Sequence, residues 1–482
     1  MNDCGKRRRI GTGKLQTALQ KVLYDKKEKI AFITANEQIS YENVVKKIEV
    51  QCEEYNIQNI NKIAICMSNS IEFCIQLLTA ILYMDEVYIF SSLWESSLVV
   101  QICQENNVQV LVSEEGKKIF ANHDSMREHN GDVKFILFTS GTTHLPKGVV
   151  LTGENIYLNA LAAIKCMSYV ETDKILVTKP LYHSYGLTIE FIAGILVGAE
   201  FYLDRGLFNV NKVSKIIMKH EITVWCTIPT LLCIFIDKKV LEFSTLRIIA
   251  VGGARSVEKL LKNARAFWAP TPVIQMYGLT EAGPLVTCTP NDLPEEKINS
   301  IGKPVEGVKL EIRDRKDNLI TTPNVSGELV VSSQSVMTEY LNNGSATKKV
   351  KKKGRLYTGD IGYFDEDNFF YIEDRIDTMI VHDGVNIFCA EIENALMAHN
   401  KIEQAFVAGI EDILHSQIAV AYIKAIENID KKEIILWCKT KAVSVPDEII
   451  FVDNLPYNDN GKVSISNLKT MYSEYKKGVG NG

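Results

Sequence analysis

The sequence predicts an α/β fold of mixed α+β character, with a large N-terminal domain and a small C-terminal one. Short β-branched runs alternate with helical stretches through most of the chain, a pattern typical of largely parallel sheets layered with helices. Between Ile301 and Tyr371, Gly and Asn turns separate short alternating strands, which predicts an antiparallel section. The length of 482 residues supports more than one buried core.

The strand–helix alternation begins at Lys62–Cys66, which has the composition of a buried strand. The spacing of Ile71, Cys74, Ile75 and Leu78 directly after it predicts a helix. The strand pattern recurs at Val108–Val112, Val224–Ile228 and Arg247–Val251. Strands that alternate with helices in this way predict a parallel arrangement.

Two long apolar segments, Ile71–Phe90 and Gly186–Leu203, need comparison with a membrane span. A span requires about 20 nearly uncharged residues, whereas each of these segments contains at least two acidic side chains. We therefore expect both to be buried helices, the second running into a strand, and we expect no membrane insertion.

The antiparallel section is best marked at Val308–Ile312 and Gly327–Val331. A compact unit of about a hundred residues follows Arg375, which is near the lower end of domain sizes. Its expected elements are a hairpin around Asp383-Gly384, helix Ala390–His399, strands Gln404–Ile410 and Ile418–Ile423, and helix Lys431–Lys439. The predicted domains are residues 1–375 and 376–482.

Composition limits the function classes. The net charge of −5 argues against bulk binding of nucleic acid, because no face needs to be strongly basic. The eleven cysteines are odd in number and form no CxxC, so we expect reduced thiols and a cytoplasmic location. The oligomeric state stays open.

The most informative segment is an apolar strand, Phe135–Phe138, that runs directly into a hydroxyl-rich loop, with Lys147 shortly after it. The loop consists of Thr139, Ser140, Gly141, Thr142 and Thr143. A polyphosphate needs many hydrogen-bond donors and some positive charge, and these hydroxyls, backbone N–H groups and the ammonium supply them. The pattern differs from a Walker A loop, which requires G-x-x-x-x-G-K-[ST].

Thr139–Gly148 resembles the signature of the adenylate-forming superfamily, which contains acyl- and aryl-CoA ligases, adenylation domains of peptide synthetases, and luciferases. Gln275–Pro284 is similar to the second core motif of that superfamily, and Tyr357–Asp360 to its ribose-binding motif. The likeness is closest to CoA ligases and stand-alone aryl-acid adenylating enzymes. It implies two domains with a mobile C-terminal one.

The resemblance also assigns the ATP site. It implies that Glu281 binds Mg²⁺, that Thr280 reaches the α-phosphate, and that Asp360 accepts hydrogen bonds from the ribose with Arg375 beside it. Lys462 matches the catalytic lysine, whose ammonium would stabilise the adenylation transition state. The remaining implied ATP-binding residues are the loop Thr139–Thr143, Lys147, Gly253, Ala254, Gln275, Met276, Tyr277 and Gly278.

The resemblance places a hinge at Asp377 and a thiolation loop at the hairpin, with Gly384 and Asn386 as its residues. Rotation about the hinge would let one site serve both half-reactions. The chain departs from the family at His144, where glycine is usual, and at Val381, where lysine is usual. The second departure removes one expected contact to AMP or to the acyl group.

Leu181–Leu187 resembles the acyl-pocket segment of the superfamily. The resemblance implies that His183 gates the carboxylate as a catalytic residue, and that the acid pocket is formed by His183, Ser184, Tyr185, Gly252 and Met276. Amino-acid-activating relatives place an aspartate where Ser184 stands, so an α-amino acid is not expected. Met276 replaces a glycine of coumarate–CoA ligases. Its longer side chain predicts a compact aryl or short acyl acid.

The predicted function is ATP-dependent activation of a carboxylic acid to an acyl-adenylate, with release of pyrophosphate, followed by transfer to a thiol. The cofactors are ATP and Mg²⁺, and the acceptor is CoA or the phosphopantetheine of a separate carrier protein. Two alternatives stay open: an oxidative enzyme that uses the acyl-adenylate as luciferases do, and a non-catalytic nucleotide-binding module.

Overall fold

The computed structural model describes residues 10–120, 131–139, 146–204, 209–238, 245–253, 258–376, 380–382, 385–412, 416–441, 443–457 and 463–479. The chain forms two compact units. The first unit comprises Met1–Arg255, Lys262–Leu310 and Val330–Tyr357. The second unit comprises Ser256–Leu261, Glu311–Leu329 and Thr358–Gly482. The boundary predicted after Arg375 stays a prediction.

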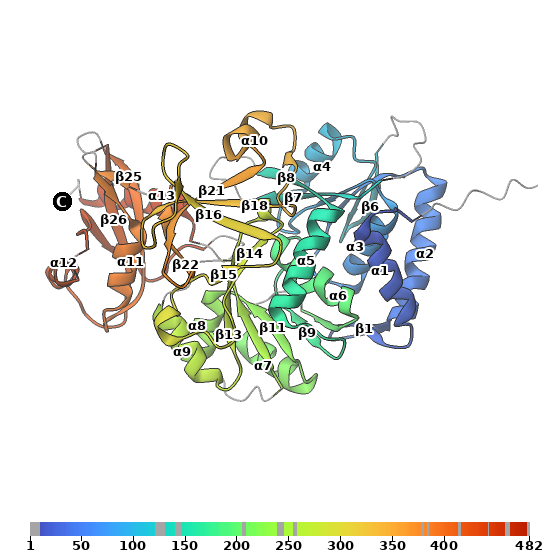
Figure 1. Ribbon diagram of the computed structural model, residues 1–482, viewed down its shortest axis with the longest axis horizontal. Coiled ribbons are helices and arrows are strands. Elements are labelled where there is room, and N and C mark those ends of the chain that lie inside the picture. The colour runs from blue at the N-terminus through green and yellow to red at the C-terminus, as the bar shows by residue number, and fades with distance from the viewer. Residues whose placement is uncertain are drawn as a thin grey trace, which may run out of the picture. The chain divides into compact units, whose positions relative to one another are not determined.

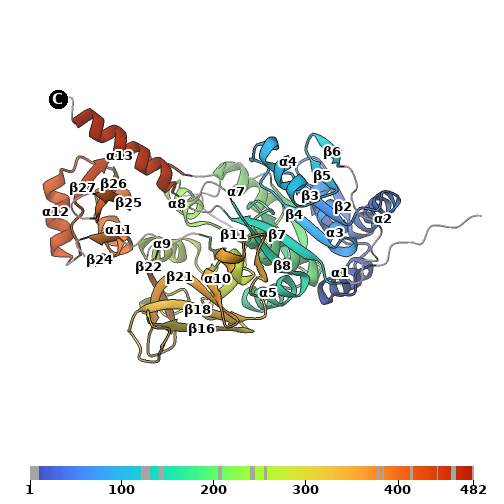
Figure 2. The same ribbon diagram turned by 90° about the horizontal axis from the view of Figure 1, so that it is seen from above.

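One sheet of the first unit has seven strands in the order β19-β8-β7-β4-β3-β5-β6 (Figure 2). Its inner strands β7, β4, β3 and β5 are parallel, and the outer ones pair antiparallel. The strands are β3 (Lys62–Cys66), β4 (Glu86–Ile89), β5 (Val110–Ser113), β6 (Gly116–Ile119), β7 (Lys134–Thr139), β8 (Lys147–Thr152) and β19 (Glu339–Tyr340).

The other sheet of the first unit has nine strands in the order β15-β14-β13-β12-β11-β9-β10-β1-β2 (Figure 1). The run from β13 to β1 is parallel, which confirms the predicted architecture, and β14, β15 and β2 are antiparallel. The strands are β1 (Ile30–Ile33), β2 (Gln38–Ser40), β9 (Lys174–Val177), β10 (Glu200–Leu203), β11 (Val224–Thr227), β12 (Ile248–Val251), β13 (Val273–Gly278), β14 (Leu285–Cys288) and β15 (Lys303–Pro304).

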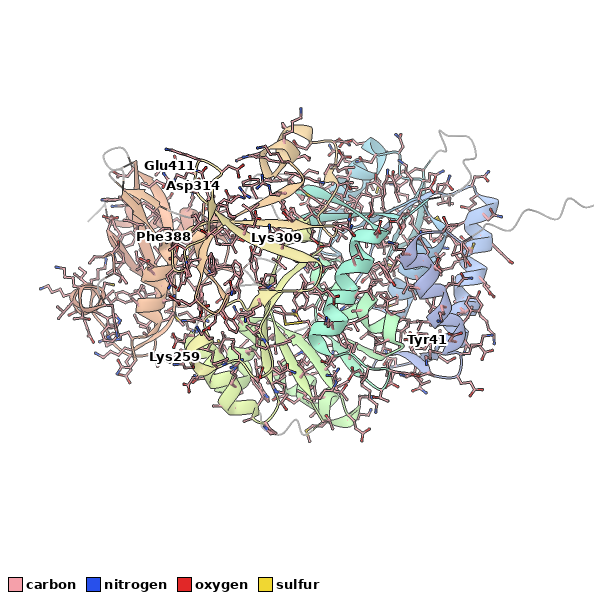
Figure 3. The ribbon with its side chains drawn as sticks, in the orientation of Figure 1. Tyr41, Lys259, Lys309, Asp314, Phe388 and Glu411 are labelled. Carbon is pink, nitrogen blue, oxygen red and sulfur yellow. A yellow bond between two sulfur atoms is a disulfide. The ribbon has the colours of Figure 1, made fainter. Side chains whose placement is uncertain are left out.

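Helices cover these sheets. On α2, Tyr41 is fully buried and its hydroxyl donates to the Ala199 carbonyl at 2.7 Å, which ties the helix to the start of β10 (Figure 3). The helices are α1 (Lys14–Asp25), α2 (Tyr41–Ile57), α3 (Ile71–Tyr83), α4 (Ser96–Glu105), α5 (Gly153–Met167), α6 (Ala193–Val197), α7 (Val210–Lys219), α8 (Pro229–Asp237), α9 (Glu258–Trp268) and α10 (Gly344–Val350), with π-helix η1 (Gly186–Ile192) and 3₁₀ turns η2 (Thr280–Ala282) and η3 (Glu295–Lys297).

The two apolar segments differ in how well they were predicted. In the second, η1 and α6 lead into β10, as expected, although the first part is a π-helix. The first segment is not helical throughout: α3 ends at Tyr83, and Glu86–Ile89 forms β4. Its apolar character is common to buried helices and buried strands, so hydropathy alone does not separate them. Across the described residues, no helix combines the length and apolar content of a membrane span.

The expectation that all cysteines are reduced is wrong for one pair. Cys166, at the end of α5, and Cys288, at the end of β14, form a disulfide with Cα atoms 6.7 Å apart. The two residues are separated by 122 positions in the sequence. Tertiary packing of α5 against β14 creates the contact, and sequence spacing carries no trace of it.

A six-stranded sheet contains the segments at which the chain passes between the two units. Its order is β17-β16-β18-β21-β20, with β22 paired to β21. The pairs β16–β17, β20–β21 and β21–β22 are antiparallel, as the turn-rich sequence predicts. The strands are β16 (Val308–Arg313), β17 (Leu319–Ile320), β18 (Gly327–Ser333), β20 (Lys351–Lys352), β21 (Arg355–Phe364) and β22 (Phe370–Arg375).

In its described residues, the C-terminal part of the second unit has a five-stranded sheet and three helices. The order is β24-β23-β26-β25, with β27 paired to β26, and the predicted hairpin strands β23 and β24 do pair antiparallel. The elements are β23 (Ile380–His382), β24 (Val385–Ile387), α11 (Cys389–Met397), β25 (Ile402–Asp412), β26 (Ser416–Ala425), α12 (Lys431–Thr440), β27 (Glu448–Phe451) and α13 (Ile465–Val479).

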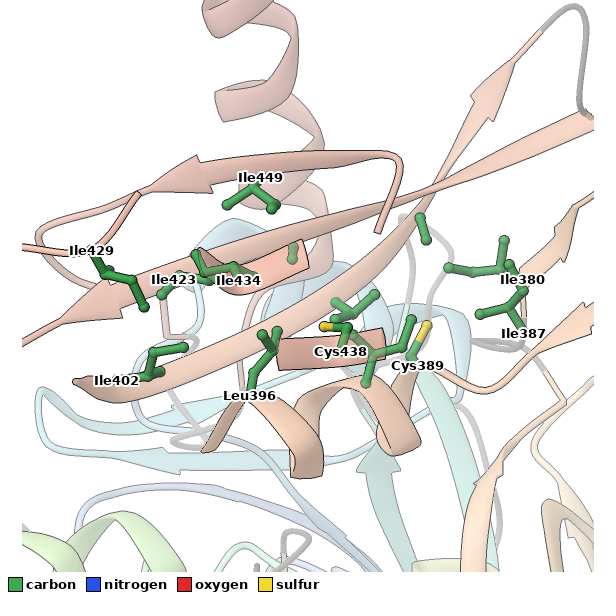
Figure 4. Packing of buried hydrophobic residues seen from close by; sticks show 14 residues of the cluster. Ile380, Ile387, Cys389, Leu396, Ile402, Ile423, Ile429, Ile434, Cys438 and Ile449 are labelled. Carbon is green, nitrogen blue, oxygen red and sulfur yellow. The ribbon is translucent and has the colours of Figure 1, made fainter. Parts of the chain in front are cut away.

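Alternation along β26 divides this part into two cores. Ala419, Ala421 and Ile423 pack in a cluster with side chains of α11 and α12 (Figure 4). The intervening residues, including Val420 and Tyr422, pack in a second cluster with α13. Successive side chains of a strand point to opposite faces, so α13 covers one face of the sheet and α11 with α12 the other.

Candidate active site

The predicted phosphate loop joins β7 to β8 in the first unit. Thr139 and Lys147 are paired across this hairpin, and the strand predicted at Phe135–Phe138 is confirmed as the middle of β7. Ser140, Gly141, Thr142, Thr143 and the departure His144 lie outside the described residues. The Lys147 Nζ lies 5.4 Å from the ring centroid of Tyr340, which belongs to the adjacent strand β19.

The second predicted motif forms β13 and the turn η2. A Cβ on Gly278 would lie 2.0 Å from the Pro284 carbonyl oxygen, so only glycine permits this tight crossing. Gly283 has φ +99°, and a Cβ there would lie 2.6 Å from the Ser335 carbonyl oxygen. The two glycines therefore allow the chain to fold back closely around Thr280 and Glu281.

Neighbouring elements hold the turn in place. The side-chain amide of Asn159, on α5, donates to the Leu285 carbonyl at 2.9 Å, and its oxygen accepts from the Leu285 N–H at 2.8 Å. The Ser335 hydroxyl donates to the Ala282 carbonyl at 2.8 Å. These groups are buried, and each buried backbone polar group needs such a partner. The turn is thus fixed at both of its ends.

Glu281 has a defined orientation. Its Oε1 accepts a hydrogen bond from the Tyr340 hydroxyl at 2.7 Å, and its backbone carbonyl accepts from the Met337 N–H at 2.9 Å. Among the described residues no group of three or more His, Cys, Asp or Glu side chains could hold a metal. A single carboxylate nevertheless suits Mg²⁺, because this ion commonly binds through one or two carboxylates, water and substrate phosphates.

The predicted acyl segment meets this turn. The Ser184 and Thr280 hydroxyls are 2.9 Å apart and hydrogen-bonded. Next to Ser184, His183 donates its N–H to the Pro180 carbonyl at 3.1 Å and packs edge-on against Tyr182. The structure therefore brings Ser184 to the residue that is predicted to reach the α-phosphate.

Tyr185, Gly252 and Met276 also come together. The Tyr185 hydroxyl donates to the Met276 sulfur at 3.3 Å. A Cβ on Gly252 would lie 2.8 Å from the Tyr185 ring and 2.9 Å from the Met276 carbonyl oxygen. Glycine at position 252 therefore makes room for the tyrosine ring. Gly253 follows with φ +86°, and Ala254 lies outside the described residues.

Two buried ionisable groups border the acyl segment, and no sequence motif indicates them. The Lys179 Nζ lies 3.3 Å from the centroid of the Tyr185 ring. Burial lowers the pKa of Lys179 to about 8 against the opposing effect of Glu190. Burial raises the pKa of Glu190 to about 8, and Lys179 partly offsets this shift. Neither side chain has a hydrogen-bond partner among the described residues.

The other residues of β13 have structural contacts. The Gln275 N–H donates to the Thr289 hydroxyl at 2.8 Å, and its carbonyl accepts from the Thr289 N–H at 2.9 Å. Its side-chain Oε1 is buried without a hydrogen-bond partner in the described part of the chain. Tyr277 follows on the same strand and is partly exposed. Their predicted contacts with ATP stay predictions.

The predicted ribose site belongs to the second unit. Asp360 is 5% exposed and its Oδ1 lies 3.2 Å from the Arg375 Nε, across a pair of facing residues on β21 and β22. Gly359 has φ +75°, and its N–H donates to Glu328 Oε1 at 3.1 Å. The sequence therefore correctly predicts that Asp360 and Arg375 are neighbours.

Several predicted residues cannot be placed. Lys462, the hinge Asp377 and Gly384 lie outside the described residues, as do the side chains of Asn386 and Val381. Conversely, no motif in the sequence indicates Tyr340, which is 59 positions from its partner Glu281. Its position beside the phosphate-loop strand depends on the edge pairing of β19 with β8, and a two-residue strand has no recognisable periodicity.

Comparison with known proteins places these motifs in context. The model of the AMP-binding enzyme family matches residues 91–341, and that of the AMP-binding enzyme C-terminal domain matches residues 391–462. The 2-succinylbenzoate–CoA ligase of Geobacillus sp. (strain WCH70) is 30% identical, with 78% of this chain and 77% of that protein covered. The ligase of the same name from Bacillus licheniformis is 33% identical, with coverage of 70% and 69%.

A solved structure agrees with this result. The O-succinylbenzoate coenzyme A synthetase of Bacillus subtilis in complex with AMP has a TM-score of 0.82 and 25% sequence identity. The match covers 94% of this chain and 98% of the synthetase. The mixed α/β fold, with its large N-terminal and small C-terminal parts, is therefore shared over nearly the whole length.

Proposed function

This chain belongs to the AMP-binding enzyme family, and we propose that it activates 2-succinylbenzoate and transfers the acyl group to coenzyme A. It is an ATP-dependent, AMP-forming ligase that joins a carboxylic acid to AMP and then acylates a thiol. The choice of acid and thiol rests on one observation: relatives at 30–33% identity over at least 70% of this chain are 2-succinylbenzoate–CoA ligases.

The proposed adenylation step uses charges that the first unit holds in place. A carboxylate oxygen of the acid attacks the α-phosphorus of ATP, and pyrophosphate leaves. Lys147 would contact the phosphates with its ammonium, and Glu281 would offer a carboxylate oxygen to Mg²⁺. When bound, Mg²⁺ supplies positive charge to the phosphate oxygens. Thr280, positioned by Ser184, would donate its hydroxyl to the α-phosphate.

We assign nucleoside recognition to the second unit. A carboxylate can accept hydrogen bonds from both ribose hydroxyls, and Asp360 is nearly buried, with Arg375 fixing its orientation. The Arg375 Nε lies 3.2 Å from Asp360 Oδ1, which leaves Oδ2 as a further acceptor oxygen for the ribose. Lys462 would supply the ammonium that stabilises the negative charge of the transition state.

The proposed acid suits the residues that meet near Thr280. The Tyr185 ring and the Met276 side chain both lie beside Gly252 and contact each other. An aromatic ring with a short acyl chain is compact. It agrees with the prediction that Met276, at a position where coumarate–CoA ligases have glycine, favours a compact acid. Ser184 provides no negative charge for an α-ammonium group, in keeping with an acid that has no amine.

The thiol step is proposed from resemblance to the family. Asp377 would act as the hinge, and the hairpin with Gly384 and Asn386 would approach the acyl-adenylate after rotation. The thiolate attacks the acyl carbon, and AMP leaves with the electrons of the broken bond. We propose coenzyme A as the acceptor, in preference to a carrier protein, because the relatives are named 2-succinylbenzoate–CoA ligases.

A panel of acids tests the assignment. ATP–pyrophosphate exchange should be fastest with 2-succinylbenzoate and slower with benzoate or cinnamate, and negligible with palmitate or phenylalanine. Mass spectrometry of the product formed with ATP and coenzyme A should show the thioester. Preferential exchange with a long fatty acid or an amino acid would contradict the proposed acid. An oxidised acid without a thioester would instead support luciferase-like chemistry.

Lys462→Ala tests the catalytic lysine. Removal of an ammonium that acts only in the adenylation transition state should lower the adenylation rate by about 10²–10³-fold. Transfer to coenzyme A from supplied 2-succinylbenzoyl-adenylate should be unchanged. Lys469→Ala, at an exposed position of α13, is the matched control and should leave both rates intact. Equal loss in both half-reactions would assign Lys462 a different role.

A further inference from the structure

We propose that Tyr340 is a positioning residue for Mg²⁺-ATP, whose hydroxyl orients the Glu281 carboxylate and whose ring holds the Lys147 ammonium. The inference rests on the magnesium role proposed for Glu281. It does not depend on the identity of the acid, because it concerns ATP binding alone. All three residues belong to the first unit.

The hydroxyl of Tyr340 occupies one oxygen of Glu281. It donates to Oε1 at 2.7 Å, and Tyr340 itself is 5% exposed, so the bond is largely shielded from water. An ionised carboxylate has two acceptor oxygens, and the bond at Oε1 leaves Oε2 for another ligand. The phenol therefore selects the rotamer in which Glu281 presents Oε2.

The ring of Tyr340 faces the second charge. Lys147 Nζ lies 5.4 Å from the ring centroid, which is within the range of a cation–π contact. Neither Lys147 nor Glu281 has an ion-pair partner in the described part of the chain. Tyr340 thus contacts one acidic residue, Glu281, and one basic residue, Lys147. The carboxylate stays available for a metal ion and the ammonium for phosphate.

The backbone around Tyr340 is held firmly. Leu341 N–H donates to the Gly148 carbonyl at 2.7 Å, and Thr338 N–H donates to the Val150 carbonyl at 2.9 Å. The Lys351 ammonium bonds the carbonyls of Met337 and Thr338 at 2.7 and 3.1 Å. Since β19 is attached to β8, which begins at Lys147, the phenol keeps a fixed distance from the phosphate-loop strand.

Tyr340→Phe removes the hydroxyl and keeps the ring. We expect the dissociation constant of ATP, measured by calorimetry without acid, to rise about tenfold in the presence of Mg²⁺, as for loss of a bond to a charged group. The Mg²⁺ concentration giving half-maximal ATP binding should rise in parallel. ATP affinity without Mg²⁺ should be unchanged, because the contact with Lys147 remains.

Tyr88→Phe is the matched control, since the Tyr88 hydroxyl donates to Glu86 Oε2 at 3.0 Å and the residue is buried in β4 of the same sheet. Its free energy of unfolding should fall by an amount comparable to that of Tyr340→Phe. The Mg²⁺ concentration giving half-maximal ATP binding should not change. A cycle with Glu281→Gln separates the causes: Tyr340→Phe should have no further effect on Mg²⁺ dependence in that background.

The outcomes are distinguishable. An unchanged Mg²⁺ dependence in folded Tyr340→Phe, or a full additional effect in the Glu281→Gln background, would overturn the proposal. If Tyr340→Phe does not fold, Tyr340→His takes its place: it lacks the phenol hydroxyl that bonds Glu281 Oε1, so the Mg²⁺ concentration giving half-maximal ATP binding should rise. An unchanged concentration in folded Tyr340→His would overturn the proposal. If the ATP affinity of the wild type does not depend on Mg²⁺, the magnesium role of Glu281 is refuted instead. Failure to activate 2-succinylbenzoate would refute only the proposed acid.

Discussion

Lys179 and Glu190 lie in the protein interior beside the acyl segment, with the Lys179 ammonium on the face of Tyr185. An unpaired buried charge is costly, and both groups respond by shifting their pKa to about 8, Lys179 downward and Glu190 upward. At neutral pH Glu190 is therefore mostly protonated. The π-helix η1 places it there, and such helices are frequent at functional sites.

Glu190→Gln should change the pH dependence of stability. In the wild type the raised pKa means that the folded state keeps a proton that the unfolded state loses above pH 4.5. This contribution is present below pH 4.5 and is lost as pH rises to about 8. Between pH 5.5 and 7.5 the wild type should thus lose roughly 2–3 kcal/mol of unfolding free energy relative to Glu190→Gln.

Urea unfolding at pH 5.5, 6.5 and 7.5 measures this difference. Lys179 does not interfere, because its lowered pKa affects stability only above about pH 8. Glu306→Gln is the control, since the Glu306 side chain is 68% exposed in its contact with Lys165. Parallel pH profiles for the wild type and Glu190→Gln would show that Glu190 is already ionised in the folded protein.

Residue-level prediction from the sequence was strongest for residues inside contiguous motifs. Asp360 and Arg375 were expected to be neighbours and are ion-paired, because two adjacent antiparallel strands bring them face to face. Tyr340 and Lys179 were missed. Their importance arises from contacts with Glu281 and Tyr185 that depend on tertiary structure, and neither has a local pattern that separates it from an ordinary aromatic or basic residue.

At the scale of elements, composition and periodicity located strands better than they described helices. The strand expected at Lys62–Cys66 is found with the same bounds. The π-helical geometry of Gly186–Ile192 was not predicted, because its apolar residues also satisfy the ordinary helical period. The disulfide between α5 and β14 was missed for a different reason: which cysteines meet depends on how helices pack on the sheet.

Cys166→Ser should destabilise the first unit. The disulfide closes a loop with a sequence separation of 122 residues, and loops of this length lose considerable entropy when they are cross-linked in the unfolded chain. We expect the unfolding free energy to fall by about 2–4 kcal/mol. A reductant should lower the wild-type value by a similar amount and leave Cys166→Ser unchanged.

Alkylation of the denatured protein, followed by mass spectrometry, counts the thiols directly. Two additional alkylated cysteines should appear after reduction, at positions 166 and 288. Cys233→Ser is the control because Cys233, a partly buried cysteine of α8, lies outside the disulfide. Full alkylation without reduction would show that the pair is not oxidised, and then the reductant should have no effect on stability.

At the scale of the whole molecule, the sequence predicted the fold class and two domains but not the order of the strands. Parallel strands, crossovers and the long-range pairing of β19 with β8 join segments far apart in the chain. Local periodicity contains no information about such partners. The domain boundary also depends on which long-range contacts are formed, and the compact units divide the chain at Tyr357 and Thr358 as well as in earlier segments.

The predicted boundary after Arg375 can be tested with an isolated fragment of residues 376–482. Both hydrophobic clusters of this part lie within Ile380–Tyr475, so the fragment contains its complete cores. We expect one cooperative urea transition with an m value of about 1–2 kcal/mol/M, and Ala421→Asp should abolish it by placing a charge in the first cluster. A transition in residues 358–482 but not in 376–482 would move the boundary to Thr358, because the strands β21 and β22 would then be needed for folding.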